Sequence, residues 1–412
     1  MIYLDNAATT PVRPEVLEAM LPYLKEEYGN PSGLYLTAVK AKEAVEKARK
    51  TIADTLGCEE EEIYFTSGGT ESDNWAIKSA VQTAAEQKSE GSNEKEREGE
   101  TERADLLKNC HIITTQIEHH AVLRTCQALE REGCAVTYLR VNEMGQISLK
   151  ELEKAIRPET VLFSVMMANN EVGTVQPVKE IGAIARRRHI FFHTDAVQAY
   201  GHLPISVKEM NIDMLSASAH KCGGPKGVGF LYVRRGVNLP PFMHGGGQER
   251  GRRAGTENVP GIVGFGKAAE LAAVQMKQTE KETALMRDHL IRRLLTEIPY
   301  ARLNGSWKNR LAGNCNISFQ FTEGGALLIL LDEEGICAAA GSACSTGSKE
   351  PSHVLKAMGI PDDIARGTLR LTIGHQNTME EMDQVVESMK KCVARLRKNA
   401  GEYEDFRNHM PG

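Results

Sequence analysis

The stretch VLFSVMMANNEVGTVQPVKEIGAIARRRHIFFHTDA, residues 161–196, contains two apolar runs with an amphipathic segment between them. The runs VLFSVMM (161–167) and IFFHTDA (190–196) are short, apolar and rich in β-forming residues, which predicts two strands. The segment VKEIGAIARRR (178–188) repeats its apolar residues at intervals of three and four, which predicts a helix. A strand, a helix and a strand in this order favour two parallel strands covered by the helix, so the stretch predicts an α/β fold.

The same alternation continues on both sides of this stretch. Further strands are predicted at EIYFT (62–66), HIITT (111–115), AVTYLR (135–140) and VGFLYV (228–233), and another helix at HAVLRTCQALERE (120–132). Together these segments predict a mostly parallel sheet covered by helices. Ligands in such sheets bind in the crevice at the carboxyl ends of the strands, so we expect the chemistry there.

The chain is expected to form two domains. A long helical pattern over 263–298 begins a smaller part, and we predict a large domain over 13–258 and a small α+β domain that combines 1–12 with 259–412. Residues 86–103, EQKSEGSNEKEREGETER, contain no large apolar side chain. Such a segment buries too little surface to offset its ordering entropy, so we expect a solvated insertion in the large domain.

Composition argues against several classes of partner. The 412 residues are 41% hydrophobic and 25% charged, as in ordinary globular proteins, and 50 basic and 55 acidic residues give a net charge of −5. Without a basic surplus, neither nucleic acid nor an anionic membrane is expected as a direct partner. The first residues, MIYLDNAATTPVRPE, lack the pattern of a secretory signal, and no run approaches about 18 apolar residues, so we expect a cytoplasmic location.

The cysteines point to one reactive thiol. Nine are scattered along the chain and none stands in a C-x-x-C pair, which predicts reduced thiols and no metal site of the zinc-ribbon or ferredoxin type. Cys344 lies in AAAGSACSTGSKEPS (338–352), among glycine, serine, alanine and lysine, whereas a core cysteine packs among large apolar residues. We therefore expect a mobile, hydrated loop with Cys344 as a candidate nucleophile, and we expect the other eight cysteines to be packing residues.

Two motifs follow predicted strands in the first half of the chain. In YFTSGGTESDN (64–74), Gly69 and Thr70 stand where a strand leads into a helix, which is either an anion site at a helix N-terminus or a plain turn capped by Thr70. In TTQIEHHAVL (114–123), His119 lies just beyond a strand and is either a satisfied polar group or a catalyst.

Two more motifs follow strands in the second half. HTDAVQ (193–198) ends a strand with Asp195 and Gln198, which can hydrogen-bond a protonated ring nitrogen and a phenolic oxygen, or simply cap a helix. In SASAHKCGGPKGVGFLYV (216–233), Lys221 is either a turn lysine or, at the edge of a buried pocket, an amine that forms a Schiff base with a carbonyl. A phosphate site, a ring-nitrogen acid, a Schiff-base lysine and a histidine on one sheet are together what pyridoxal phosphate needs.

A series of motifs resembles, in the same order, those of the NifS/IscS-type cysteine desulfurases. These motifs are YLDNAATTPV, GNPS, FTSGGTESDN, IEHHAVL, NNEVGTVQP, DAVQ, SAHKCGGPKG, HGGGQERGRRAGTENV and GSACSTGS. The similarity runs from residue 1 to about residue 375, with 86–103 as an interruption. It implies a fold-type I pyridoxal-phosphate homodimer of the class V aminotransferases that converts L-cysteine to L-alanine and leaves a persulfide on an enzyme cysteine. The GSACSTGS pattern resembles the group I branch of the family.

The resemblance also implies roles for residues that match its motifs. Lys221 would hold the cofactor, Asp195 would pair with the pyridine nitrogen, Gln198 would contact the phenolic oxygen, and His119 would stack on the ring and move protons. The phosphate would be bound by Gly69, Thr70, Ser218 and His220, with Thr256 contributed by the partner subunit. Asn170 would lie near the cofactor and the substrate, Arg370 in GTLRLTIG would hold the substrate carboxylate, and Cys344 would receive the sulfur.

Several alternatives remain open at this point. A selenocysteine lyase, a cysteine-sulfinate-type enzyme and an aminotransferase share the fold, and a non-enzymatic sulfur-transfer scaffold would keep it without the chemistry. The sulfur acceptor is an iron–sulfur scaffold, a tRNA-thiolation enzyme or another carrier protein. Gly33 and Tyr35 stand where the family commonly has serine and histidine, so the entrance of the site is expected to differ.

We predict that deleting residues 88–102 leaves the melting temperature and the desulfurase activity nearly unchanged. The segment has no apolar anchor, and the closure entropy of a solvated loop changes by only about 0.6 kcal/mol for each doubling of its length. Thermal unfolding and alanine formation from L-cysteine check this expectation. A large loss of either quantity would mean that the segment packs against the body of the protein or against the site.

Overall fold

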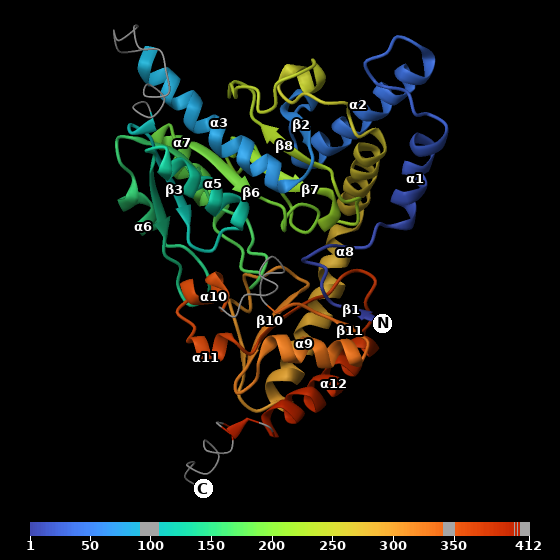
Figure 1. Cartoon of the computed structure of the whole chain (residues 1–412), viewed down its shortest axis with the longest axis vertical. Helices are drawn as coiled ribbons and strands as arrows, with labels where there is room; N and C mark the ends of the chain where they lie inside the picture. The colour runs from blue at the N-terminus through green and yellow to red at the C-terminus, as the bar shows by residue number, and fades with distance from the viewer. Residues whose placement is uncertain (91–106, 341–350, 399, 402, 404–412) are drawn as a thin grey trace.

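The computed structural model describes residues 1–90, 107–340, 351–398, 400–401 and 403. Most of the expected insertion 86–103 and the expected nucleophile Cys344 therefore lie outside the described residues. Figure 1 shows two parts, one above the other, with the seven-stranded sheet in the upper part and the C-terminal helix in the lower part.

A seven-stranded sheet forms the centre of the upper part, in the order β2-β8-β7-β6-β5-β3-β4. Its strands are β2 (Ile63–Thr66), β3 (His111–Thr115), β4 (Ala135–Leu139), β5 (Thr160–Ser164), β6 (Phe191–Asp195), β7 (Met214–Ser218) and β8 (Gly229–Val233). Only β8 runs antiparallel to its neighbours in this sheet. The prediction of a mostly parallel α/β sheet is confirmed, although β5 ends three residues earlier than the apolar run 161–167 suggests.

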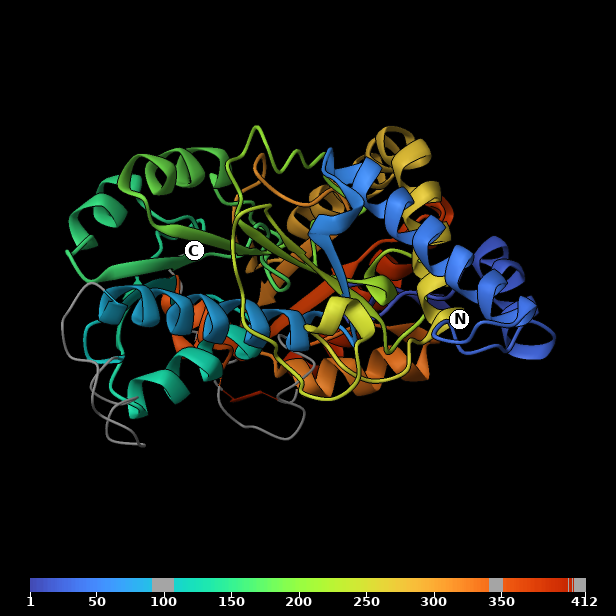
Figure 2. The same cartoon turned by 90° about the horizontal axis from the view of Figure 1, so that it is seen from above.

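Helices cover both faces of this sheet (Figure 2). The helices of the upper part are α1 (Pro14–Lys25), α2 (Leu36–Leu56), α3 (Gly69–Glu90), α5 (His120–Arg131), α6 (Leu149–Ala155) and α7 (Val178–Arg188). On one face, Leu162 and its neighbours pack with α3 and α5. On the other face, Phe163 and its neighbours pack with α2, α7 and the start of α8 (Val259–Glu297). Because successive side chains point to opposite faces, burial of both faces explains why these strands read as continuous apolar runs.

The lower part is built on a second sheet with its own core, while its residues Val354 and Leu355 pack in a further cluster with Met166 of the upper part. Its strands are β9 (Ala301–Leu303), β10 (Asn314–Phe319) and β12 (Thr368–Thr372), and its helices are α9 (Gly324–Glu333), α10 (His353–Ala357), α11 (Asp362–Ala365) and α12 (Met379–Lys398). The sheet is antiparallel, in the order β12-β10-β9. The chain start joins this part, because β1 (Ile2–Tyr3) pairs in parallel with β11 (Ile336–Cys337) and Leu4 is buried in the second core.

Helix α8 belongs to both cores. It begins where the Asn258 side chain accepts a hydrogen bond from the amide of Gly261, with Pro260 in the first turn, two features typical of a helix start. Phe265 packs in the first core and Leu290 in the second, and Figure 1 shows the helix passing from the upper part to the lower one. Among the described residues, no helix is long and apolar enough to cross a membrane.

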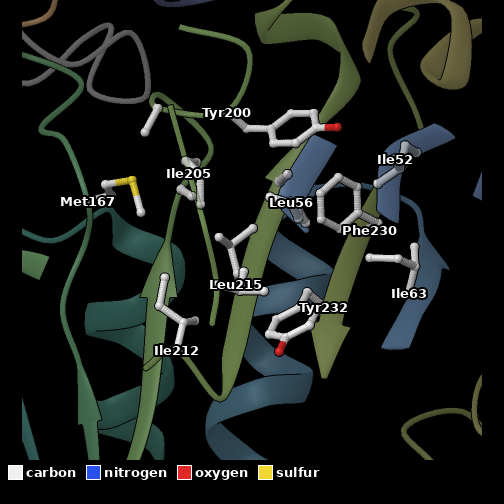
Figure 3. Packing of buried hydrophobic residues seen from close by; sticks show 14 of the residues in the cluster. Ile52, Leu56, Ile63, Met167, Tyr200, Ile205, Ile212, Leu215, Phe230 and Tyr232 are labelled. Carbon is white, nitrogen blue, oxygen red and sulfur yellow. The ribbon is translucent and has the colours of Figure 1, made fainter. Parts of the chain in front are cut away.

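Aromatic rings pack among branched aliphatic side chains in the core at β7 and β8, where Figure 3 shows Tyr200, Phe230 and Tyr232. Phe230 stacks on Phe265 at a centroid distance of 5.4 Å and meets Tyr200 edge-on at 5.0 Å. The Tyr200 hydroxyl is hydrogen-bonded to the Thr55 hydroxyl at 2.8 Å, so the polar end of this buried ring is satisfied. Phe230 is fully buried and fills the space between the sheet and α8.

We predict that Phe230→Ala lowers the free energy of unfolding by about 3–5 kcal/mol, because it leaves a cavity among rings that cannot collapse into it. Urea unfolding of the full-length chain measures this loss. The control is Val274→Ala on α8, whose side chain is 82% exposed, and we expect it to change stability by less than about 0.5 kcal/mol. Equal effects of the two substitutions would contradict the packing described for Phe230.

Candidate active site

A cavity of about 320 Å³ lies at the carboxyl ends of the central strands. Its volume is within the range of pockets that bind small molecules. Ten of the residues singled out in the sequence line it: Gly69, Thr70, His119, Asn170, Asp195, Gln198, Ser218, His220, Lys221 and Arg370. The structure therefore brings together residues from distant parts of the chain, from Gly69 to Arg370.

One end of the cavity is made by the turn between β2 and α3. Helix α3 begins at Gly69, so Thr70 lies inside its first turn and does not cap the helix, and the anion site stays a prediction. A Cβ atom added at Gly69 would lie 2.5 Å from Cγ2 of Val197, so this position has no room for a side chain. Ser218 ends β7 on the same cavity wall. Amides of a helix start beside a hydroxyl form a suitable cradle for a phosphate group.

Lys221 and His220 end a short 3₁₀ turn, Ala219–Lys221, that follows β7. Lys221 Nζ donates hydrogen bonds to the backbone carbonyls of Ala7 and Ala8, both at 2.7 Å. His220 Nδ1 is hydrogen-bonded to the Thr9 hydroxyl at 3.2 Å, and burial lowers the pKa of His220 to about 4. The imidazole is therefore neutral at physiological pH, and Lys221 is the cation on this wall.

Asp195 is the last residue of β6 and is buried. Its Oδ1 accepts a hydrogen bond from the amide of Val197 at 2.9 Å. Burial raises the pKa of Asp195, and the nearby His119 and Lys221 act in the opposite direction. Gln198 follows, and its amide donates to the carbonyl of Ala7 at 2.9 Å. An acid and an amide are thus held on the same wall as the lysine.

His119 stands immediately before α5. Its Nδ1 accepts a hydrogen bond from the amide of Ala121 at 3.1 Å, so the neutral ring carries its proton on Nε2. Burial lowers the pKa of His119, while Asp195 acts against this shift. The result is a neutral imidazole with a defined donor atom at the cavity.

Arg370 reaches the cavity from β12 of the lower part. Its Nη2 donates to Oδ1 of Asp5 at 2.8 Å and its Nη1 to the carbonyl of Asn170 at 3.0 Å. Among the described residues, its Nε is buried without a hydrogen-bond partner. This guanidinium is suited to bind a carboxylate in the cavity.

Two predicted residues are not part of this cavity as described. Thr256 is exposed at the surface and does not line it. Cys344 lies outside the described residues. The chain on either side of it is attached near the cavity, because Ala339 and Arg370 exchange backbone hydrogen bonds and the Ser352 hydroxyl donates to the carboxylate of Glu171.

Asp73 is a cavity residue that the sequence reasoning missed. It is 1% exposed, its Oδ1 has no hydrogen-bond partner among the described residues, and it lies 3.6 Å from Nε2 of His193. Burial and then the charge of Asp195 raise the pKa of Asp73 well above its ordinary value, whereas burial lowers the pKa of His193 to about 3. Burial therefore favours the protonated form of Asp73, beside a neutral histidine. The sequence signal available for Asp73 was its position four residues after Gly69, which places both residues on the same face of the helix.

The sequence matches a known protein family over most of its length. The model of the aminotransferase class-V family matches residues 2–91 and 100–385. The chain belongs to this family. It is 54% identical over 396 residues, 96% of this chain and 93% of the relative, to a protein of Methanosarcina thermophila named cysteine desulfurase IscS.

Solved structures agree with this placement. A NifS-like protein superposes with a TM-score of 0.85 at 38% identity and covers 96% of this chain and 99% of its own. A structure described as SspA in complex with cysteine gives a TM-score of 0.77 at 39% identity, with 92% of this chain and 100% of the other covered. Within the class-V family, the chain is therefore one of the NifS/IscS-type cysteine desulfurases, which are enzymes with the fold expected above.

We predict that Asp73→Asn makes the cofactor-free chain more stable than wild type at neutral pH. Since the folded-state pKa lies above the ordinary value of 3.8, the folded wild-type chain binds a proton that the unfolded chain releases. The wild type therefore loses stability as the pH rises from about 4 through the folded-state pKa, and the variant lacks this loss. Urea unfolding at pH values from about 4 to 8 measures the difference between the two. A difference that stays flat or shrinks as the pH rises would contradict the proton on Asp73.

Proposed function

We propose that the chain is a pyridoxal-phosphate-dependent cysteine desulfurase that converts L-cysteine to L-alanine and transfers the sulfur to Cys344 as a persulfide. The observation that carries the proposal is the convergence of Lys221, Asp195, His119 and Arg370 on one cavity with a phosphate cradle at its end. The reported complex of a related protein with cysteine supports this substrate.

The described residues fit the cofactor. Lys221 would hold it covalently, Asp195 would pair with the ring nitrogen, Gln198 would contact the phenolic oxygen, and His119 would lie on the ring. Gly69, Thr70, Ser218 and His220 would bind the phosphate, with Asn170 beside the ring. The fit rests on the cradle that has no room for a side chain at Gly69 and on the buried carboxyl of Asp195. When bound, the cofactor supplies an electron sink for the bonds at the α- and β-carbons of the substrate.

Side chains of the protein would bind the substrate and transfer the protons. The guanidinium of Arg370 binds the substrate carboxylate, and its contact with Asp5 fixes its orientation. Lys221 Nζ would take up the α-proton, and the carbonyls of Ala7 and Ala8 would hold the ammonium that results. Nε2 of His119 gives and receives protons at the cavity.

The thiolate of Cys344 completes the reaction. Its sulfur forms a bond to the substrate sulfur while the bond between that sulfur and the β-carbon breaks, and the carbon fragment gains protons to become alanine. Cys344 is five residues beyond Ala339 (344 − 339 = 5), which pairs with Arg370. Five residues span at most about 17 Å, so the cavity wall is within reach of the thiol.

Several finer features belong to the same proposal. A homodimer in which Thr256 of each copy binds the phosphate of the other would explain why this threonine is exposed here. The distinct cores of the two sheets support a large domain over 13–258 and a small domain of 1–12 with 259–412, which meet in a further cluster where Met166 packs with Val354. The eight described cysteines are free thiols, which suits a reducing compartment such as the cytoplasm. The persulfide would be passed to an acceptor protein, either an iron–sulfur scaffold or a tRNA-thiolation enzyme.

We predict that Cys344→Ser abolishes persulfide formation and lowers alanine formation at least about 100-fold, because a serine oxygen is a poor nucleophile towards sulfur. The variant keeps the visible absorbance of the lysine-bound cofactor, whereas Lys221→Ala loses it. Mass spectrometry after brief exposure to L-cysteine locates the additional sulfur atom, and alanine is assayed in parallel.

Cys337→Ser is the matched control. Cys337 lies seven residues upstream (344 − 337 = 7) in β11, where it pairs with Tyr3, and this variant should keep activity within about twofold. Persulfide found on Cys337 or Cys222, or full activity of Cys344→Ser, would overturn the assignment of the nucleophile.

A further inference from the structure

Two charged residues join segments that serve different phosphate sites in the proposed dimer. We call residues 67–70 the cup and residues 244–256 the arm. The cup lies at the phosphate end of the cavity, and the arm carries the exposed Thr256. In sequence the two segments are far apart, yet a single carboxylate bonds to both of them.

This carboxylate belongs to Glu71, which directly follows the cup. The guanidinium of Arg253 in the arm donates from Nε to Oε1 at 2.7 Å and from Nη2 to Oε2 at 3.1 Å. The amide of Ser67 in the cup donates to the same Oε2 at 2.8 Å. The side chains of Glu71 and Arg253 are only 10% and 20% exposed. Such a two-point, charge-assisted contact fixes both distance and orientation.

Residues 249 and 250 of the arm are held in a strained backbone conformation by a second ion pair. Glu249 and Arg250 have φ angles of 45° and 58°, a region that non-glycine residues rarely adopt. The carboxylate of Glu249 accepts from Arg49 at 2.8 and 3.0 Å and from the amide of Phe65 in β2 at 2.9 Å. Strain of this kind persists only where surrounding contacts hold it. The arm is therefore built to leave the body of the protein at a fixed place.

The charge state of the pair suits this role. Burial raises the pKa of Glu71, but the hydrogen bonds from Arg253 and Ser67 outweigh it and lower the pKa overall. The carboxylate is thus ionised at physiological pH. A negative charge next to a phosphate site is unfavourable by itself, and the guanidinium of Arg253 neutralises it.

We propose that Glu71 and Arg253 are positioning residues for the cofactor phosphate. Their ion pair fixes the arm of each subunit relative to the cup of the same subunit, and this arm reaches the cup of the partner subunit. This inference rests on the proposed function, because it requires the cofactor and the exchange of Thr256 between subunits. The pair does not touch the phosphate. It holds in place the amide of Ser67 and the part of the arm that leads to Thr256.

The test compares two ligands that differ only in the phosphate. Full-length protein stripped of cofactor is titrated with pyridoxal phosphate and with pyridoxal, and binding is followed by absorbance. We expect Glu71→Gln and Arg253→Gln to weaken the affinity for pyridoxal phosphate by at least about tenfold and to leave that for pyridoxal within about twofold. The double variant should lose no more than either single variant, because both remove the same contact.

Arg250→Gln is the matched control. Arg250 lies in the same arm and has the same charge, but it donates to the carbonyls of Glu60, Glu61 and Ile63 and not to the cup. This variant should keep the ratio of the two affinities. The inference would be overturned if the Glu71 and Arg253 variants lost both affinities in parallel, so that the ratio of the affinities for pyridoxal phosphate and pyridoxal stayed unchanged. An equal effect of Arg250→Gln on this ratio would overturn it as well. The ion pair would then only stabilise the fold.

Failure of the proposed function would look different. In that case the wild type itself would bind pyridoxal phosphate no more tightly than pyridoxal, or would be a monomer by sedimentation. Either result would overturn the inference together with its premise, before any variant is considered.

Discussion

The residues that follow the first strand run between the two cores and hydrogen-bond to both. Asp5 binds the guanidinium of Arg370 from the lower part, while the carbonyls of Ala7 and Ala8 accept from Lys221 of the upper part. Thr10 continues the contact through the carbonyl of His220. The cavity has two walls from two separate cores, and this short segment is the backbone that connects them at the site. Its own position is fixed by burial of Leu4 and by the pairing of β1 with β11.

Burial of charge shapes the chemistry of the cavity. An isolated carboxylate in an apolar interior is unstable, so buried acids take up protons unless a partner keeps them ionised. Burial raises the pKa of both Asp195 and Asp73. At Asp195 the hydrogen bond from the amide of Val197 and the charge of Lys221 act against this shift, whereas at Asp73 the charge of Asp195 adds to it. Glu118, next to His119, is also fully buried, and burial raises its pKa to about 8. A cationic ring nitrogen beside Asp195 would counteract the effect of burial and favour the ionised form of that carboxyl.

The fold and most of the site were predictable from sequence because their signals are local. Strands buried on both faces read as apolar runs, and polar residues at their carboxyl ends, such as Asp195 and His119, share one edge of a parallel sheet. The antiparallel direction of β8 was not predictable, since it depends on how the chain returns after the turn at Lys221. Asp73 was missed because a single acid on a helix resembles a solvated residue until the packing of α3 against β7 buries it. Thr256 follows only from the family resemblance, as no local pattern indicates which copy of the chain it serves.

Helix α8 has a consequence for how the site binds its ligand. With 39 residues it is about 58 Å long, and it is packed into the upper core at one end and the lower core at the other. Movement of one core relative to the other would require this rod to bend or to leave its packing. The positions of Lys221 on one wall and Arg370 on the other are therefore preorganised for the ligand of the cavity. Little binding energy goes to closing the two cores around such a ligand, which leaves more of it for orienting the bonds that break.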